Sequence, residues 1–330
     1  MAKLRIVPRG PYSLAASASF LCGFTPASGS SCSLDDGRLV LGFLDEVHHR
    51  PVTVALEQAA SGDVTGEAVL PPGHRDEGAA RAVERQVARL LSLDHDARGL
   101  ATIAEHDAPV REMLAAMPGF RPVCFPSPYE AAVWGLLAQR ITMPCAAKIK
   151  TRLAVATGTV AEGFGRSFHP APAPEALLAL RTFDGLPAEK LTRLHAVAVA
   201  ALEGKLDAAR LRVMSRERAI ESLRSIRGVG PWTAEHVLLR GCGVVDELPA
   251  AEPRVLRAIA AAYDLRADAS ANDVLEIAER WRPYRMWIAV LLVMNLRRSI
   301  FPRSSRPRNA RTSRACERAS GLPSQGAGAL

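Results

Sequence analysis

The sequence lacks two features that quickly assign a chain to a class: closely paired cysteines and a long apolar segment. Its six cysteines are scattered, at Cys22, Cys32, Cys124, Cys145, Cys242 and Cys316. None forms a C-x-x-C pair, so the spacing indicates neither a zinc site nor a dithiol redox motif. No apolar run approaches the roughly 18 residues of a membrane-spanning helix. These absences predict a cytoplasmic globular protein with free thiols and no membrane contact.

The positive charge of the chain is concentrated in one short stretch. The formal net charge is +8, and eight arginines and one glutamate within 297–318 account for seven of these charges. The rest of the chain is nearly neutral, so the high isoelectric point does not by itself indicate a basic clamp for nucleic acid. Residues 301–330 are rich in Arg, Ser, Pro and Gly, and we expect them to be disordered. This tail is either a solvated appendage or a source of non-specific attraction to phosphate.

Apolar periodicity divides the remaining chain into two parts. In residues 1–95, which we interpret as mainly β up to about residue 70, short apolar runs at 38–44 and 52–56 predict strands, and the spacing over 78–93 predicts a helix. From 96 to 300 the spacing is helical. The expected body helices begin near 128 and 143 and then cover 174–182, 187–203, 215–225, 233–240, 253–263 and 281–296, with a loop at 158–174. The predicted fold class is α+β, with a small β-rich N-terminal domain beside a mainly helical body.

One helix of the body has a strong local start signal. Ser127 is a typical N-cap, Pro128 suits the first helical position, and Glu130 could close a capping box.

A glycine-containing turn, Ile226–Ala234, is the most informative stretch of the body. Gly228 and Gly230 can adopt the positive φ angles of a tight hairpin at little steric cost. The N–H groups that begin the next helix lie at the positive end of its dipole, which suits one phosphate group. By itself a Gly-x-Gly turn is more often a helix–turn–helix corner that binds nothing.

The sequences around this turn resemble a known family. Ile226–Ala234, together with Glu235–Gly241, Asp246–Glu252 and Glu279–Trp287, is similar to the helix–hairpin–helix DNA glycosylases, in particular the bacterial DNA-3-methyladenine glycosylase II type. The resemblance covers most of residues 1–300. It implies hydrolysis of the N-glycosidic bond of alkylated bases in duplex DNA, by a cytoplasmic, nucleoid-associated monomer. No cofactor is implied, although a monovalent cation at the hairpin carbonyls is possible in the family, and abasic-site repair enzymes would act on the product.

Glu252 is the candidate catalytic residue. The family places an Asp three residues after a Pro, and counting from Pro249 this position is Glu252. A carboxylate there would stabilise the oxocarbenium-like sugar and orient water. The extra methylene shifts the carboxylate by about 1 Å, which can cost on the order of 100-fold in rate. Glu252 could instead only cap the helix that Pro253 begins. Asp246 is the alternative acid, although a structural role suits it better.

The family also assigns positions to DNA contacts. Gly228, Val229, Gly230 and Thr233 would hold a backbone phosphate, Arg140 would fill the gap left by the flipped base, and Gln139 would contact the opposite strand or support the turn. Aromatic residues could form the base pocket or belong to the core, namely Trp232, Trp134, Tyr129, Tyr284 and Trp287.

Two features separate the rival hypotheses. Trp232 stands where bifunctional relatives carry a Lys, so no Schiff base and no strand cleavage are expected. Only Cys316 follows the last helix, which excludes the iron–sulfur cluster of endonuclease III. The main alternative is a catalytically weak or inactive relative that binds damaged DNA, because Glu252 replaces the family's Asp.

Overall fold

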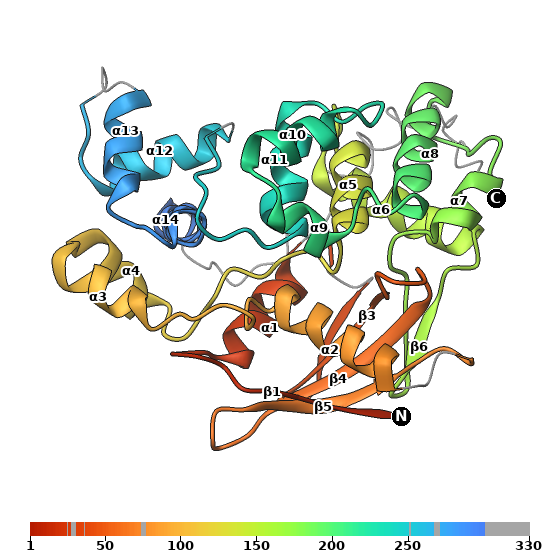
Figure 1. The fold of residues 1–330 in the computed structure, drawn as a ribbon, viewed down its shortest axis with the longest axis horizontal. Helices are drawn as coiled ribbons and strands as arrows, with labels where there is room; N and C mark the ends of the chain where they lie inside the picture. The colour runs from red at the N-terminus through yellow and green to blue at the C-terminus, as the bar shows by residue number, and fades with distance from the viewer. Residues whose placement is uncertain are drawn as a thin grey trace, which may run out of the picture.

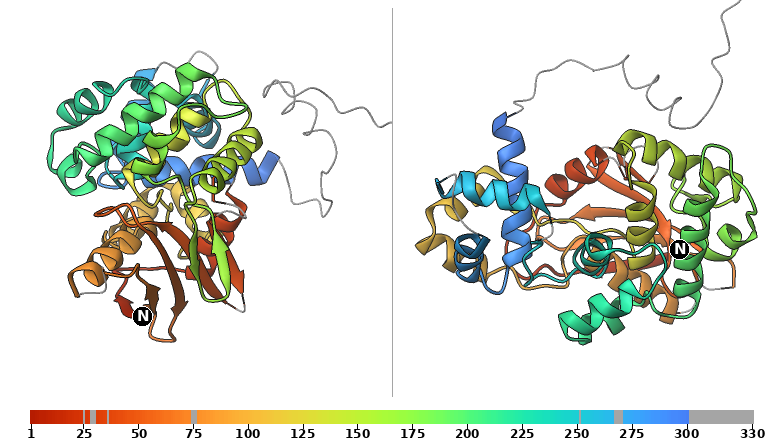
Figure 2. Two further views of the ribbon diagram at one scale, coloured as in Figure 1. Left: turned by 90° about the vertical axis from the view of Figure 1, so that its right-hand side faces the viewer. Right: turned by 90° about the horizontal axis from the view of Figure 1, so that it is seen from above.

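The computed structural model describes residues 1–24, 26–27, 31–35, 37–73, 77–250, 252–266 and 271–300. A layer of β-strands lies below a larger helical body (Figures 1 and 2), which confirms the α+β class. The tail at 301–330, predicted to be disordered, lies outside the described residues, as does Cys316. No helix within the described ranges is long and apolar enough to cross a membrane.

The N-terminal sheet contains five antiparallel strands in the order β1-β5-β4-β3-β2. They are β1 (Ala2–Ile6), β2 (Cys32–Asp35), β3 (Arg38–Leu44), β4 (Pro51–Gln58) and β5 (Val64–Val69). Strands β3 and β4 confirm the two predicted strands. Their side chains alternate between two covered faces: Leu39 and Leu41 belong to the core beneath the helices, whereas Val40 packs on the opposite face.

Two helices cover one face of this sheet. The helix α2 (Glu77–Leu90) confirms the helix predicted over 78–93, whereas α1 (Leu14–Gly23) corrects the interpretation of residues 1–70 as mainly β. Ser13 caps α1 by accepting a hydrogen bond from Ala16 N at 3.2 Å. Leu14, Ala18 and Leu21 recur at helical spacing and are buried against the sheet.

A short hairpin from the helical body covers the other face of the sheet. Strands β6 (Ala161–Gly163) and β7 (Arg166–Phe168) lie within the segment predicted to be a loop, so that prediction was incomplete. Phe168 packs directly on Gly42 of β3, where an added β-carbon would lie 2.4 Å from Phe168 Cβ. The glycine therefore permits the close contact that joins the two parts of the chain.

The prediction that the cysteines are free is wrong for two of them. Cys22, near the end of α1, forms a disulfide with Cys32, the first residue of β2. The ten-residue separation carries no motif, but β2 returns along α1 and brings the two α-carbons to 5.5 Å. Cys124, Cys145 and Cys242 are free and buried.

The helices of the body form two lobes. The first, here called the hairpin lobe, is built around α5 (Pro128–Leu137), every residue of which is buried. Its other helices are α6 (Met143–Ala156), α7 (Pro174–Ala179), α8 (Ala188–Leu202), α9 (Ala208–Val213), α10 (Arg216–Arg224), α11 (Pro231–His236) and the single π-helical turn η1 (Val237–Gly241). The sequence predicted all of these except the short α9 and the π-helical character of η1.

At the start of α5, the Glu130 side chain bonds to residues that are distant in the sequence. Ser127 accepts a hydrogen bond from Glu130 N at 3.1 Å, as its predicted N-cap role requires. The Glu130 carboxylate does not complete the expected capping box; it accepts hydrogen bonds from Leu44 N at 3.2 Å and from Ala171 N at 3.3 Å. This buried carboxylate therefore joins the end of β3 to the hairpin lobe.

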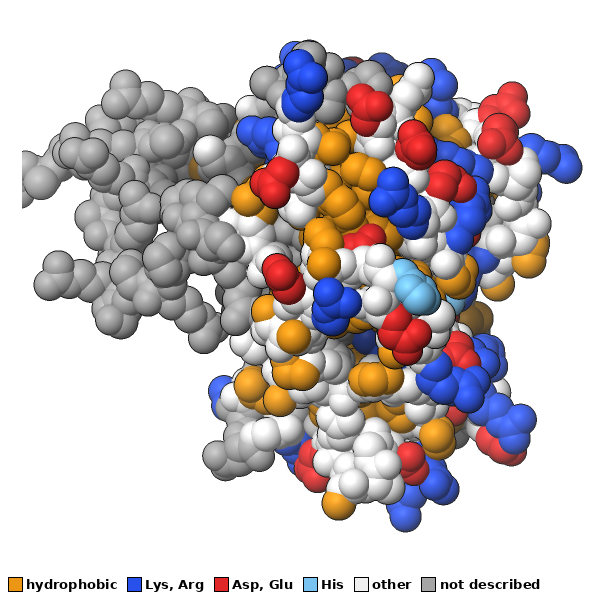
Figure 3. Space-filling view, turned by 90° about the vertical axis from the view of Figure 1, so that its left-hand side faces the viewer, with side chains coloured by type: hydrophobic (Ala, Val, Ile, Leu, Met, Phe, Trp, Pro, Cys, Tyr) orange, Lys and Arg blue, Asp and Glu red, His pale blue; other side chains and the backbone are white. Residues whose placement is uncertain are grey.

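The second lobe, here called the C-terminal lobe, combines segments far apart in the sequence. Its helices are α3 (Gly99–His106), α4 (Ala108–Ala116), α12 (Pro253–Ala262), α13 (Ala271–Glu279) and α14 (Arg285–Ile300). Figure 1 shows α3 and α4 beside α14, and the three helices share one hydrophobic cluster. The face over this lobe displays acidic and basic side chains interspersed around an exposed hydrophobic area (Figure 3), so it is not uniformly basic.

Candidate active site and nucleic-acid interface

The hairpin joins α10 to α11 and turns tightly at Gly228. Val229 N donates to Ile226 O at 3.0 Å, and the side chains of both residues are buried. Gly228 has φ +90°, the left-handed region that favours glycine. Gly230 does not use this freedom: it is extended, with φ −83° and ψ 178°, and begins α11. Within the described part of the chain Gly230 offers no side-chain cap, so the first N–H groups of α11 receive no acceptor from their N-cap residue.

Two neighbouring elements hold the hairpin in place. Gln139 Nε2, from the turn after α5, donates to Gly228 O at 3.3 Å, and Gln139 Oε1 accepts from Arg193 Nη1 at 3.4 Å. The Arg193 stem lies against the glycine, since an added β-carbon at position 228 would be 2.7 Å from Arg193 Cγ and Cδ. Gln139 thus supports the turn, one of the two roles expected for it. The Gly228 carbonyl keeps a second lone pair, and the cation stays a prediction.

Arg140 occupies the tip of the turn that follows α5. It has φ +61°, which is uncommon for a residue with a side chain, and it is exposed. Lys190 Nζ donates to Leu137 O at 3.0 Å and to Gln139 O at 2.9 Å, and so satisfies carbonyls at the end of α5. The arrangement presents Arg140 to solvent on a well-anchored turn, as a residue that enters a DNA duplex would require.

Glu252 lies beside the hairpin helix although it belongs to the other lobe. It is the N-cap of α12 and accepts from Arg254 N at 3.1 Å, so it caps the helix that Pro253 begins, a role that is compatible with catalysis. Its two oxygens also accept from Arg254 Nε at 2.7 Å and Nη2 at 2.6 Å. The indole Nε1 of Trp232 lies 3.4 Å from Glu252 Oε2. The hydrogen bonds from Arg254 lower the pKa of the Glu252 carboxyl to about 2, so it is ionised at neutral pH.

An aromatic series continues from Trp232 into the protein. Trp232 keeps 37% of its surface exposed and stacks on His236, with ring centroids 5.0 Å apart and 7° between the planes. His236 meets the edge of Phe125 at 5.2 Å, and Phe125 meets Phe24 at 5.9 Å. Burial lowers the pKa of His236 to about 3, so the ring is neutral. His236, Phe125 and Phe24 were not among the predicted site residues; only the four-residue spacing of Trp232 and His236 on one helix could have indicated a pair.

The other predicted site residues lie away from Glu252 or in the core. Tyr284 and Trp287 stack on each other within the C-terminal lobe, and Tyr129 is buried with its hydroxyl donating to Pro172 O at 2.7 Å. Thr233 is also buried, so only its backbone could meet a phosphate. Asp246 accepts from Arg282 Nη1 at 3.0 Å and from Arg285 Nε at 2.8 Å, which ties the segment before α12 to α14.

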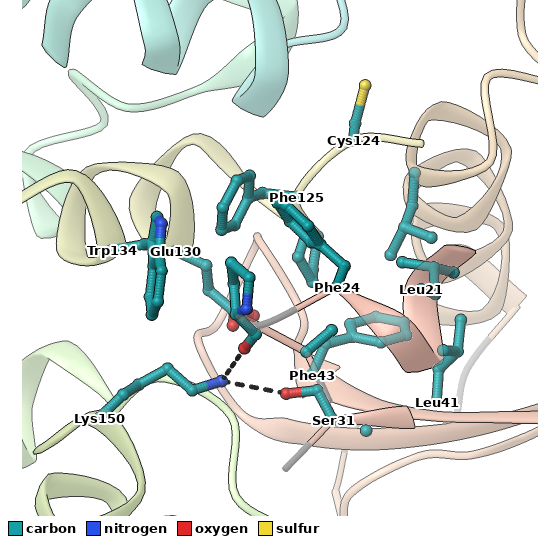
Figure 4. Close-up of a pocket in the computed structure, with 15 residues that line it drawn as sticks. Leu21, Phe24, Ser31, Leu41, Phe43, Cys124, Phe125, Glu130, Trp134 and Lys150 are labelled. Atoms are coloured by element: carbon teal, nitrogen blue, oxygen red, sulfur yellow. Dashed lines mark hydrogen bonds between the residues drawn. The ribbon is translucent and has the colours of Figure 1, made fainter. Parts of the chain in front are cut away.

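Trp134 lines a separate pocket between the N-terminal domain and the hairpin lobe (Figure 4). The pocket has a cavity volume of about 40 Å³, and its walls include Phe24 and Phe125. Lys150 Nζ donates there to Pro26 O at 2.9 Å and to Ser31 Oγ at 3.2 Å. Burial lowers the pKa of Lys150 to about 8, which the nearby carboxylate of Glu130 partly opposes. Phe125 lines this pocket and also contacts His236, so its ring lies between the pocket and the His236–Trp232 pair.

Parts of the sequence and the overall fold are similar to those of known proteins. No protein-family profile matches the chain. A DNA-3-methyladenine glycosylase of Bacillus subtilis (strain 168) is 25% identical over 206 residues, which cover 61% of this chain and 68% of that protein. The DNA-3-methyladenine glycosylase 2 of Escherichia coli (strain K12) is 29% identical over 182 residues, 52% of this chain and 59% of the relative. A solved 3-methyladenine DNA-glycosylase from Archaeoglobus fulgidus superimposes with a TM-score of 0.69 and 24% identity, over 91% of this chain and 99% of that one.

The chain is similar in sequence to DNA-3-methyladenine glycosylases, and it shares the fold of a solved one. Against the 3-methyladenine DNA-glycosylase of A. fulgidus, the superposition takes in most of the chain, so the N-terminal sheet and the helical body share one fold with it.

Proposed function

We propose that the protein is a monofunctional DNA glycosylase that releases alkylated bases from duplex DNA. The observation that carries this proposal is the juxtaposition of an ionised carboxylate, Glu252, with the exposed ring of Trp232 on the helix that follows the hairpin. The names of the relatives support the substrate class. The protein would act as a monomer, without a cofactor, and leave an abasic site for downstream repair enzymes.

Each part of the site has a defined task in this reaction. The backbone N–H groups of Gly228, Gly230 and Thr233 hold a backbone phosphate, and Arg140 occupies the space left by the extruded base. The electron-poor base stacks on the outer face of Trp232. As the bond between the sugar and the base breaks, its electron pair leaves with the base. Glu252 stabilises the positive charge on the sugar and accepts the proton of the attacking water. Trp232 has no amine, so no Schiff base forms with the sugar and no strand cleavage follows.

One observation favours the alternative, a relative that binds damaged DNA without releasing the base. Both oxygens of Glu252 are engaged by Arg254, at 2.7 and 2.6 Å, and this cation partly offsets the negative charge that the reaction would use. For the enzyme, Arg254 must turn away when the sugar arrives. For a binding protein, the pair would stay closed and Glu252 would remain a helix cap.

Release of free base from methylated duplex DNA distinguishes the two functions. We expect the wild type to release base and Glu252→Gln to lose at least about 100-fold in rate with unchanged duplex affinity, because a neutral amide cannot stabilise the sugar cation. The matched control is Glu112→Gln, an exposed residue of α4 in the same lobe. If the wild type binds the duplex but releases none of 3-methyladenine, 7-methylguanine or hypoxanthine from suitable substrates, the glycosylase proposal fails.

A further inference from the structure

Two arginines beside the hairpin converge on one exposed carboxylate. Glu189, in the first turn of α8, accepts from Arg193 Nε through Oε1 at 3.1 Å and from Arg227 Nη2 through Oε2 at 3.1 Å. Arg227 belongs to the hairpin itself, and Arg193 packs on Gly228. Two guanidinium groups thus surround a single anion next to the backbone that the proposed function assigns to phosphate binding.

In an ordinary surface ion pair both side chains move freely, whereas here neighbouring residues restrict the positions of the two arginines. The stem of Arg193 is confined against Gly228, and its Nη1 donates to Gln139 Oε1 at 3.4 Å. Arg227 is fixed at its backbone by the hairpin. Exposed ion pairs contribute little to stability, so Glu189 can be displaced at small cost by a stronger anion. A phosphodiester has two non-bridging oxygens that share one negative charge, and the two guanidinium groups can donate hydrogen bonds to both oxygens.

We propose that Arg193 and Arg227 form a second phosphate-binding site beside the hairpin, and that the Glu189 carboxylate occupies this site until DNA binds. This inference rests on the proposed function, because the phosphate that it requires is that of bound DNA. Glu189 then moderates non-specific binding, because any duplex must displace it, while the fold keeps both arginines in position. The site joins α8 and the hairpin to the turn that carries Arg140.

The salt dependence of binding to an undamaged fluorescent duplex, measured by anisotropy between about 50 and 200 mM KCl, tests the site. Each phosphate neutralised adds about 0.9 to the slope of log affinity against log salt. We expect Glu189→Gln to steepen the slope by about one and to tighten binding roughly 3- to 10-fold at low salt, because a like charge beside the phosphate is removed. Adding Arg193→Gln and Arg227→Gln to this variant should reverse both effects.

The matched control is Glu203→Gln at the C-cap of the same helix. Glu203 is similarly exposed and pairs with Lys205 at 2.8 Å, so the variant has the same change of net charge. It lies about 21 Å along α8 from Glu189, well beyond the Debye length of about 8–10 Å. We expect wild-type affinity and slope from it. If Glu189→Gln behaves like Glu203→Gln, or if the triple variant keeps the steeper slope, the site is refuted. Base release from methylated duplex DNA, measured with the same protein variants, judges the glycosylase proposal separately.

Discussion

Replacing Gly228 by alanine should destabilise the protein, whereas replacing Gly230 should weaken DNA binding and leave stability almost unchanged. At Gly228, φ is +90°, and a β-carbon would meet the Arg193 stem at 2.7 Å. Holding a non-glycine residue in this region costs about 1–3 kcal/mol, and Arg193 must also shift. For a chain of this size we expect the midpoint of thermal unfolding to fall by roughly 1.5–5 °C.

Gly230 is the matched position in the same turn. Its φ of −83° and ψ of 178° suit alanine, and a β-carbon there meets nothing within 4 Å in the described structure. The stability should therefore change by no more than about 0.5 kcal/mol. In the proposed complex that open space is where a phosphate approaches the backbone, so the methyl group should lower duplex affinity by about tenfold.

Calorimetry measures the unfolding temperature of both variants, and fluorescence anisotropy measures their affinity for duplex DNA. The reasoning is refuted if Gly230→Ala binds duplex DNA as tightly as the wild type, because the hairpin would then not approach a phosphate closely. It is also refuted if Gly228→Ala unfolds at the wild-type temperature.

Two further variants test the core around the site. Because the pKa of His236 is about 3 when folded and near 6.5 when unfolded, the neutral ring stabilises the protein above pH 6.5, and this contribution is lost as the pH falls toward 3. The free energy of unfolding of the wild type should therefore fall between pH 7 and pH 5 by about 1–2 kcal/mol more than that of His236→Phe. Denaturant titrations at both pH values measure the two losses, and equal losses would contradict this expectation. Glu130→Ala should cost about 2–5 kcal/mol, because it leaves the buried N–H groups of Leu44 and Ala171 without their acceptor. An unchanged denaturant midpoint would show that water replaces the carboxylate.

Local signals predicted much of the fold. Ser127 and Pro128 start α5 as expected, because an N-cap depends only on residues within one helical turn. The partners of Glu130 lie 86 and 41 residues away, and no local pattern specifies such contacts. The same limit applies to Cys22 and Cys32, whose pairing depends on how β2 returns along α1.

The candidate site was predictable only in part. The family resemblance brought Glu252 and Trp232 into consideration, and the structure places them 3.4 Å apart. Phe125 has no periodic or motif signal, since it lies in the irregular segment before α5 and reaches His236 through the tertiary fold. For Trp287 the sequence left pocket and core both open, because an aromatic residue at helical spacing suits either, and in the structure it is buried in the core of the C-terminal lobe.

The exposure of Trp232 gives the protein an intrinsic optical reporter. The chain contains four tryptophans, and Trp134, Trp281 and Trp287 are 3%, 0% and 0% exposed, against 37% for Trp232. A water-soluble collisional quencher should therefore reach one indole, and that indole borders Glu252. A base that stacks on this ring would both quench its emission and shield it from the quencher. Base entry and departure could then be followed in time on unlabelled protein and DNA, separately from bond cleavage.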